Sequence, residues 1–192
     1  MNRLEASIFL IPIALGSTSL LYLSMYNENF FSPFTDNGTY ETPIAIVLLI
    51  SFLYFMIDFV LMIVRYNPKD NIYFLHHTVG LLSILFVYFK YYHIIKYLLS
   101  FLMYELSTPF LYISLECHRK GITNIFSKII NIIFFISYTL VRILFGTYLL
   151  FHLVPVIYAL DSPFQYLMLL PIILQLLNYW WYYKIILYQR KK

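Results

Sequence analysis

Charged residues and cysteine are both scarce in this chain of 192 residues. Only 11% of its residues are charged, whereas a soluble domain usually has about 25%. The single cysteine, Cys117, excludes an intramolecular disulfide and a cysteine-ligated metal cluster. What the chain has instead is apolar and aromatic residues, which make up 61% and 21% of the total. A soluble globule of this size could not bury so much apolar surface, so the composition predicts a membrane protein.

Long apolar runs, separated by polar breakers, divide the chain into about six segments. A helix needs about 20 apolar residues to cross a hydrocarbon core about 30 Å thick, and six such helices leave room only for short loops. We therefore predict an all-α, polytopic membrane fold with one transmembrane domain over residues 1–192. Its helices are expected at about 8–26, 43–64, 72–88, 94–115, 125–151 and 164–187.

Basic residues gather on one side of this predicted topology. With six spans, both termini share a side with the second-to-third and fourth-to-fifth loops, and that side collects most of the 13 Lys and Arg residues. Positive loops face the cytosol, so both termini are expected to be cytosolic. These residues are distributed over separate short loops, which disfavours nucleic acid as a partner. The opposite side carries the sequon Asn37-Gly38-Thr39, a candidate glycosylation site that stays unused if the membrane lies too close.

Several predicted spans contain ionisable or amide side chains. A charged group at the centre of a membrane helix costs about 2.5–3.5 kcal/mol on insertion scales and by default implies a function. Polar residues at helical spacing on five helices predict stripes that face inward, around a polar cavity. The alternative is interhelical hydrogen bonds that only hold the helices together, at about 0.6 kcal/mol each. The residues concerned are Tyr54, Asp58, His76, His77, Glu105, Thr108, Arg142, Gln175 and Asn178.

The depth of these groups follows from the helical rise of about 1.5 Å per residue. Asp58, His76, His77 and Glu105 are expected between the cytosolic interface and the midplane. Arg142 is expected deeper, in the luminal half, paired elsewhere. A proline within the fourth helix, Pro109, predicts a kink that frees a backbone carbonyl beside the cavity.

The sequence resembles the TRAM–LAG1–CLN8 (TLC) domain family over about residues 43–187. The resemblance rests on residues that stand in family order: Tyr54 to Asp58, the pair His76-His77, the run Glu105-Leu106-Ser107-Thr108-Pro109-Phe110, Arg142, Gln175 to Asn178, and Trp180. It implies a helical barrel in the endoplasmic reticulum or a related membrane, open toward the cytosol. The short chain is most similar to the small TLC-domain membrane proteins. It lacks the His-Asp-x-x-Asp element that follows the histidine pair in the ceramide synthase branch, which speaks against ceramide synthesis itself.

The resemblance favours a role in lipid metabolism or lipid homeostasis, and one hypothesis is an acyltransferase. In the ceramide synthases the histidine pair is implicated in moving a fatty acyl group from acyl-CoA. By that resemblance His76, His77, Asp58 and Glu105 are candidate catalytic residues. The other polar side chains would line the lipid cavity, acyl-CoA would be a co-substrate, and no bound cofactor or metal is expected. Two alternatives stay open, a non-catalytic lipid-binding regulator of membrane composition and a cargo or translocation accessory protein. Membrane lipids are the expected partners in the first two cases.

Overall fold

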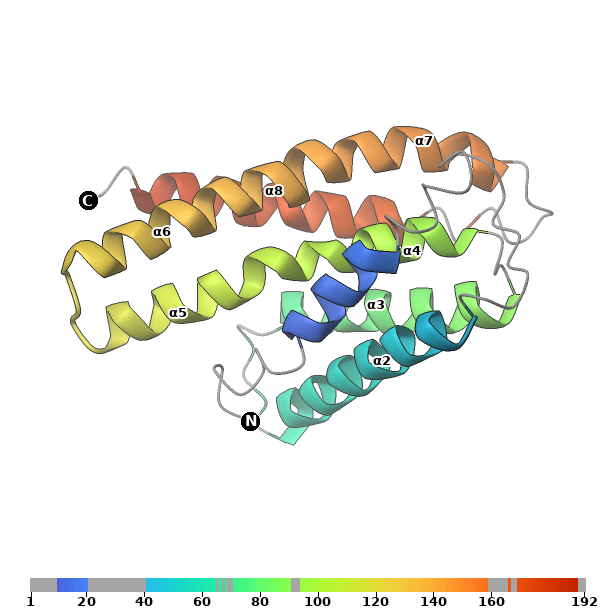
Figure 1. Ribbon diagram of the computed structural model, residues 1–192, viewed down its shortest axis with the longest axis horizontal. Helices are drawn as coiled ribbons and strands as arrows, with labels where there is room; N and C mark the ends of the chain where they lie inside the picture. The colour runs from blue at the N-terminus through green and yellow to red at the C-terminus, as the bar shows by residue number, and fades with distance from the viewer. Residues whose placement is uncertain are drawn as a thin grey trace.

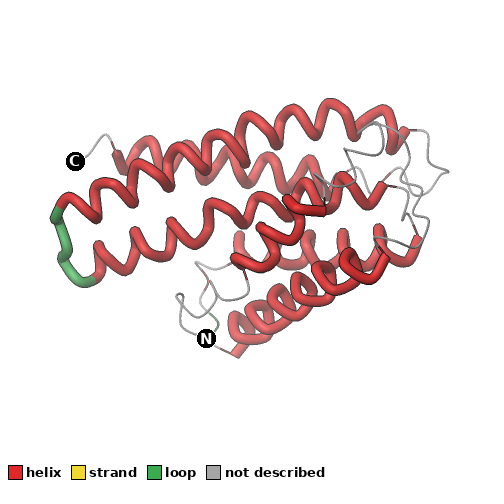
Figure 2. Tube along the Cα trace, viewed as in Figure 1, coloured by secondary structure: helices red, strands yellow, loops and turns green. Residues whose placement is uncertain are grey.

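A computed structural model describes residues 10–20, 41–64, 66, 68, 71–90, 94–158, 166 and 169–189 (Figure 1). The described part is helical and contains no strand, as Figure 2 shows. This confirms the all-α class predicted from the apolar runs. The sequon at Asn37 lies outside the described residues.

The described helices form six consecutive rods, in agreement with the six predicted segments. The first is a short apolar helix, Leu10–Leu20. Two of the rods change helical pitch along their length but contain no loop. One consists of α4, η3 and α5, and the other of α6, η4 and α7. The remaining bounds are α2 Glu41–Val64, α3 Asn71–Lys90, α4 Ile95–Leu102, η3 Met103–Ser107, α5 Thr108–Arg119, α6 Ile125–Tyr138, η4 Thr139–Phe145, α7 Gly146–Tyr158 and α8 Leu169–Gln189.

Four of the described rods are long and apolar enough to cross a membrane. These are Glu41–Val64, Asn71–Phe89, Ile95–Arg119 and Ile125–Val156. Their outward faces carry large apolar side chains, such as Leu49 and Phe151, whereas Ser51, Gln175 and Asn178 are completely or almost completely buried. A protein in lipid requires apolar groups on its outside and polar groups inside, because lipid offers no hydrogen-bond partner to a polar side chain.

Four rods pack side by side into a ring. In order, α3 packs on α8, α8 on α7 and η4, the α6–α7 rod on the α4–α5 rod, and α4 on α3, which closes the ring; α2 packs on α3. The first helix lies obliquely across the bundle in Figure 1, and its Leu10 and Ile13 belong to one apolar core with Ile44 of α2 and Leu99 of α4. The helices therefore enclose an interior into which side chains from α3, α4, α7 and α8 project.

A tight turn joins α5 to α6 and fixes these two rods as an antiparallel hairpin. Gly121 adopts a left-handed backbone conformation, with φ of 67°. Its N–H donates to His118 O at 3.1 Å, and the N–H of Ile122 donates to Cys117 O at 2.9 Å. These are the two backbone hydrogen bonds of a Schellman C-cap. Asn124 then caps α6, because its side chain accepts from Ser127 N at 3.1 Å. These local signals keep the loop short and the two helices adjacent.

Candidate functional site

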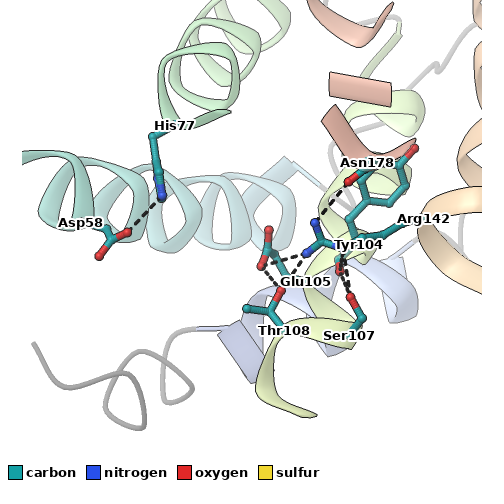
Figure 3. A network of polar contacts seen from close by, with 8 residues as sticks. All are labelled: Asp58, His77, Tyr104, Glu105, Ser107, Thr108, Arg142 and Asn178. Carbon is teal, nitrogen blue, oxygen red and sulfur yellow. Dashed lines mark hydrogen bonds and ion pairs between the residues drawn. The ribbon is translucent and has the colours of Figure 1, made fainter. Parts of the chain in front are cut away.

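A histidine and an aspartate from adjacent helices form an ion pair in the interior. His77 Nε2 of α3 lies 3.0 Å from Asp58 Oδ2 of α2, as drawn in Figure 3. The histidine is only 5% exposed, whereas the Asp58 side chain is 30% exposed. Asp58 therefore links a buried imidazole to the edge of the bundle.

This pairing leaves the other nitrogen of the His77 ring without a partner. In a neutral imidazole one nitrogen carries a proton and the other accepts, so donation from Nε2 to the carboxylate leaves the lone pair on Nδ1. Within the described part of the chain, Nδ1 of His77 is buried and has no hydrogen-bond partner. A histidine held in one tautomer by a carboxylate, with its second nitrogen free, has the arrangement of a general base.

His76 lies beside this pair and faces a different environment. Its ring centroid is 5.5 Å from that of His77, 6.0 Å from Phe55 and 5.4 Å from Trp181 of α8. Its Nδ1 is also buried without a partner among the described residues. Tyr54, one of the predicted cavity residues, is buried on the other side of His77, with ring centroids 6.2 Å apart.

His76 and Glu105 both line one elongated cavity of about 90 Å³. Its walls come from α2, α3, α4, η3, α7 and α8 and are mostly apolar. The polar groups that line the cavity are few. They are mainly His76, Tyr104 and Glu105 at one end, while Val87, Ile94 and Leu153 lie at the other. Most of the predicted polar side chains instead bind one another behind the cavity wall.

Arg142 is the centre of that second polar cluster. It is 6% exposed, and its Nη2 donates to Thr108 Oγ1 at 2.7 Å. Thr108 Oγ1 in turn donates to Glu105 Oε2 at 2.8 Å, which lies 3.8 Å from Arg142 Nη2. The buried charge of Glu105 is therefore balanced by a guanidinium, directly and through one hydroxyl.

The rest of the guanidinium is also occupied. Its Nε donates to Ser107 Oγ at 2.9 Å and to the Tyr104 carbonyl at 3.1 Å, and its Nη1 donates to Asn178 Oδ1 at 3.3 Å. Figure 3 shows these groups converging on Arg142 from the α4–α5 rod and α8. The cluster therefore joins three rods of the bundle.

The proline in the Glu-Leu-Ser-Thr-Pro run explains why a carbonyl is available to Arg142. Pro109 lies in the first turn of α5 and has no N–H, and the preceding turn, η3, is a tighter 3₁₀ helix. The N–H of Thr108 donates to Glu105 O, and the Tyr104 carbonyl accepts from Ser107 Oγ at 3.1 Å as well as from Arg142 Nε. On the other rod, Arg142 lies in a π-helical stretch, a feature common at functional sites.

The prediction that Arg142 pairs elsewhere was wrong. The depth of Glu105 was counted from a fourth helix that ends at Leu115, whereas this rod continues to Arg119. With the true end, Glu105 is about 21 Å from the α5–α6 turn and Arg142 about 25 Å. The two residues therefore lie at nearly the same level and pair with each other.

Gln175 of α8 joins the same three rods, about one helical turn before Asn178. It accepts from Tyr104 Oη at 3.0 Å, and its Nε2 donates to the Arg142 carbonyl at 3.0 Å. Gly146 lies against this contact, and a Cβ atom there would overlap Tyr104 Oη and Gln175 Oε1. Tyr104 was missed in the sequence because it is one of 20 tyrosines. The feature of the sequence that could have indicated a buried polar role for Tyr104 is its position directly before Glu105.

The fold and the buried ionisable groups define an all-α membrane protein with a polar site in its interior. A family model of the TLC domain (TRAM–LAG1–CLN8) matches residues 3–187. A TLC domain-containing protein of Acanthamoeba polyphaga mimivirus is 43% identical over 199 residues, which cover 100% of this chain and 96% of that protein. The chain belongs to the TLC domain family, which is membrane-associated and linked to lipid metabolism. The match also includes the first helix, which precedes the residues that carried the resemblance.

Proposed function

We propose that this TLC domain protein transfers a fatty acyl group from acyl-CoA to a lipid acceptor. The observation that carries the proposal is the His77–Asp58 pair at 3.0 Å, with a free Nδ1 on His77. Beside it, His76 lines a cavity with mostly apolar walls, in which part of an acyl chain would lie. A base, a carboxylate that orients it and a chain-binding cavity are the parts that acyl transfer needs.

In the proposed reaction His77 Nδ1 removes the proton from a hydroxyl or amine of the acceptor. The acceptor atom attacks the thioester carbon, a new ester or amide bond forms, and the carbon–sulfur bond breaks. The proton then passes from His77 to the departing CoA thiolate, so that no group on the protein changes overall. Asp58 stabilises the imidazolium that forms between these steps, as a carboxylate does for histidine in other acyl transfers.

Basic side chains support acyl-CoA as the donor. The α5–α6 turn lies at the end of the bundle where α2 ends (Figure 1), and Arg119 and Lys120 are exposed there. Both also bind Glu116, at 2.6 Å and 3.2 Å, so a CoA phosphate would share them with that carboxylate. Asp58 lies toward this same end of α2, which ends at Val64.

Replacing Asp58 with asparagine tests the proposal. A hydrogen bond to a charged group contributes about 1.5–3 kcal/mol, and a tenfold rate change corresponds to about 1.4 kcal/mol. We therefore expect Asp58→Asn to lower transfer of a labelled acyl chain about tenfold to a hundredfold in membranes that contain the protein. Glu41→Gln, an exposed acid at the opposite end of α2, is the matched control and should keep wild-type transfer. Equal rates for wild type and Asp58→Asn would contradict the proposed role of the pair.

A non-catalytic lipid-binding regulator is the second candidate. It is favoured by the Glu105–Arg142 cluster, which is buried and internally bonded and could serve as a fixed wall of a lipid site without chemistry. In that case membranes containing the wild-type chain would show a changed lipid composition but no transfer from labelled acyl-CoA. The composition would also change to the same extent with Asp58→Asn.

We further propose that the chain resides in the endoplasmic reticulum or a related membrane with both termini in the cytosol. This orientation directs the end with Arg119 and Lys120 toward the compartment that supplies acyl-CoA. In sealed microsomes, protease added outside should remove a tag fused to the C-terminus while a luminal marker stays intact. A tag that is protected until detergent is added would reverse the orientation.

A further inference from the structure

Phe55 of α2 lies against both histidines and also forms part of the cavity wall. Its ring centroid is 5.2 Å from that of His77 and 6.0 Å from that of His76, and in both contacts the rings meet edge to face. Phe55 and His76 line the cavity, whereas His77 is not among the described residues that line it. The Phe55 ring therefore separates the proposed base from the cavity.

The tip of the Phe55 ring is seated against the backbone of α3. A Cβ atom at Gly80 would lie only 3.3 Å from Phe55 Cζ, so the ring reaches α3 because Gly80 has no side chain. Gly80 follows the histidine pair by about one helical turn, and Phe55 is only 4% exposed. The ring thus fills the space between α2 and α3 along this turn.

We propose that Phe55 keeps water away from His77, so that a lipid rather than water accepts the acyl group. This inference rests on the proposed function and adds to it the residue that decides between the two acceptors. Nδ1 of His77, the atom assigned as the base, is buried and has no hydrogen-bond partner among the described residues. A base with a free lone pair would also activate water. A transferase built in this way must therefore exclude water from the base.

Removing the Phe55 ring would change what the interior can hold. A buried water needs about two to four polar partners and enough room, and in the wild type the ring occupies the room beside His77. Without it, the unpartnered nitrogens of His76 and His77 would face the enlarged space together with Glu105. We therefore expect water beside His77 in Phe55→Ala.

Hydrolysis of acyl-CoA would then compete with transfer. His77 Nδ1 would take a proton from this water, the water oxygen would attack the thioester carbon, and the carbon–sulfur bond would break. The proton would pass to the CoA thiolate, so that the products are a free fatty acid and CoA. General-base assistance contributes about 10²–10⁴-fold. Hydrolysis by Phe55→Ala should therefore exceed that by the wild type by about 10²-fold, the lower end of this range.

More conservative variants and a control distinguish the shield from a general loss of packing. Phe55→Leu keeps most of the side-chain volume and should hydrolyse acyl-CoA at nearly the wild-type rate. Phe55→Val removes less volume than Phe55→Ala and should give an intermediate rate, so it suffices if the alanine variant does not fold. Phe52→Ala is the matched control, since Phe52 lies about one turn earlier on α2 and is partly buried against the apolar core. This control should keep the wild-type ratio of fatty acid to lipid product.

The experiment uses the full chain and has two readouts. In membranes that contain each variant, the label of acyl-CoA is followed into free fatty acid and into lipid. In the purified protein, without acyl-CoA, X-ray radiolysis oxidises the side chains that lie next to water, and peptide mass spectrometry locates the oxidation. We expect oxidation of His76 and His77 to rise several-fold in Phe55→Ala and to stay low in the wild type and Phe55→Leu. His118, which is exposed, should be oxidised equally in all variants and is the internal reference.

Equal oxidation of His77 in the wild type and Phe55→Ala would overturn the inference. So would an unchanged ratio of fatty acid to lipid product in a Phe55→Ala variant that still uses acyl-CoA. The proposed function can fail separately, because radiolysis requires no catalysis. If oxidation rises in Phe55→Ala but the wild type neither transfers nor hydrolyses the acyl group, the exclusion of water is supported, while the acyltransferase and the choice of acceptor are overturned. If the wild type transfers the acyl group and neither readout changes in Phe55→Ala, the acyltransferase stands and Phe55 has no role in excluding water.

Discussion

Replacing Arg142 with methionine is expected to destabilise the folded protein by about 3–5 kcal/mol, the cost of removing one member of a buried ion pair. Methionine has a similar length but no donor. Glu105 would then keep its charge without this counterion, and the Tyr104 carbonyl would lose one of its two side-chain donors and keep Ser107 Oγ. The thermal midpoint of the purified protein in mild detergent is the measurement, and it should fall markedly, together with the yield of folded protein.

A second variant separates charge from packing in the Arg142 cluster. Arg142→Met combined with Glu105→Gln removes both charges, so part of the lost stability should return, because a neutral amide costs less to bury than an unpaired carboxylate. Lys184→Met is the control, since Lys184 is exposed and lies over the face of Trp180, at 4.6 Å from the ring centroid. A double variant no more stable than Arg142→Met would show that the guanidinium acts through its neutral hydrogen bonds alone.

Removing the His77 imidazole is expected to lower acyl transfer by about 10²–10⁴-fold, the usual contribution of a general base. His76→Ala should have a smaller effect, because no carboxylate of the described residues pairs with His76, which contacts Phe55, His77 and Trp181 through its ring. The measurement is the initial rate of transfer from labelled acyl-CoA in membranes with equal amounts of each variant. Lipid analysis of the same membranes shows which product class disappears.

The matched control for the histidine variants is His152→Ala. Its ring packs edge to face against Tyr148 in α7. This variant should retain the wild-type rate. If His76→Ala is the more damaging of the pair, the base assignment moves to His76. A double His76→Ala, His77→Ala variant with full transfer would remove the histidines from the mechanism altogether.

The number of helices was predictable from the sequence, because each apolar run is long enough to be recognised by itself. The inward position of Asp58, His77 and Glu105 was predictable for a similar reason, since lipid excludes charge from the outer face. The family was recognisable from the histidine pair and the Glu-Leu-Ser-Thr-Pro run.

The pairing of these residues was not predictable in the same way. Which residues meet across helices depends on where each helix ends, and four extra residues on α5 were enough to move Glu105 to the level of Arg142. Most of the cavity wall is apolar because Thr108, Arg142 and Asn178 bind within their own cluster and do not line the cavity, whereas Glu105 belongs to both. Tyr104 and the π-helical stretch around Arg142 had no distinctive local sequence.

The short turn between α5 and α6 has a consequence for how the chain enters the membrane. A lone helix with an arginine near its centre is a poor candidate for insertion, and the rod that carries Arg142 follows directly after the rod that carries Glu105. Since only Lys120 to Asn124 separate the two helices, they can enter the bilayer together as a hairpin in which the arginine already has its carboxylate. Biosynthesis of this protein should therefore treat α4 to α7 as one unit of insertion, and lengthening the turn should delay integration of the second half of that unit.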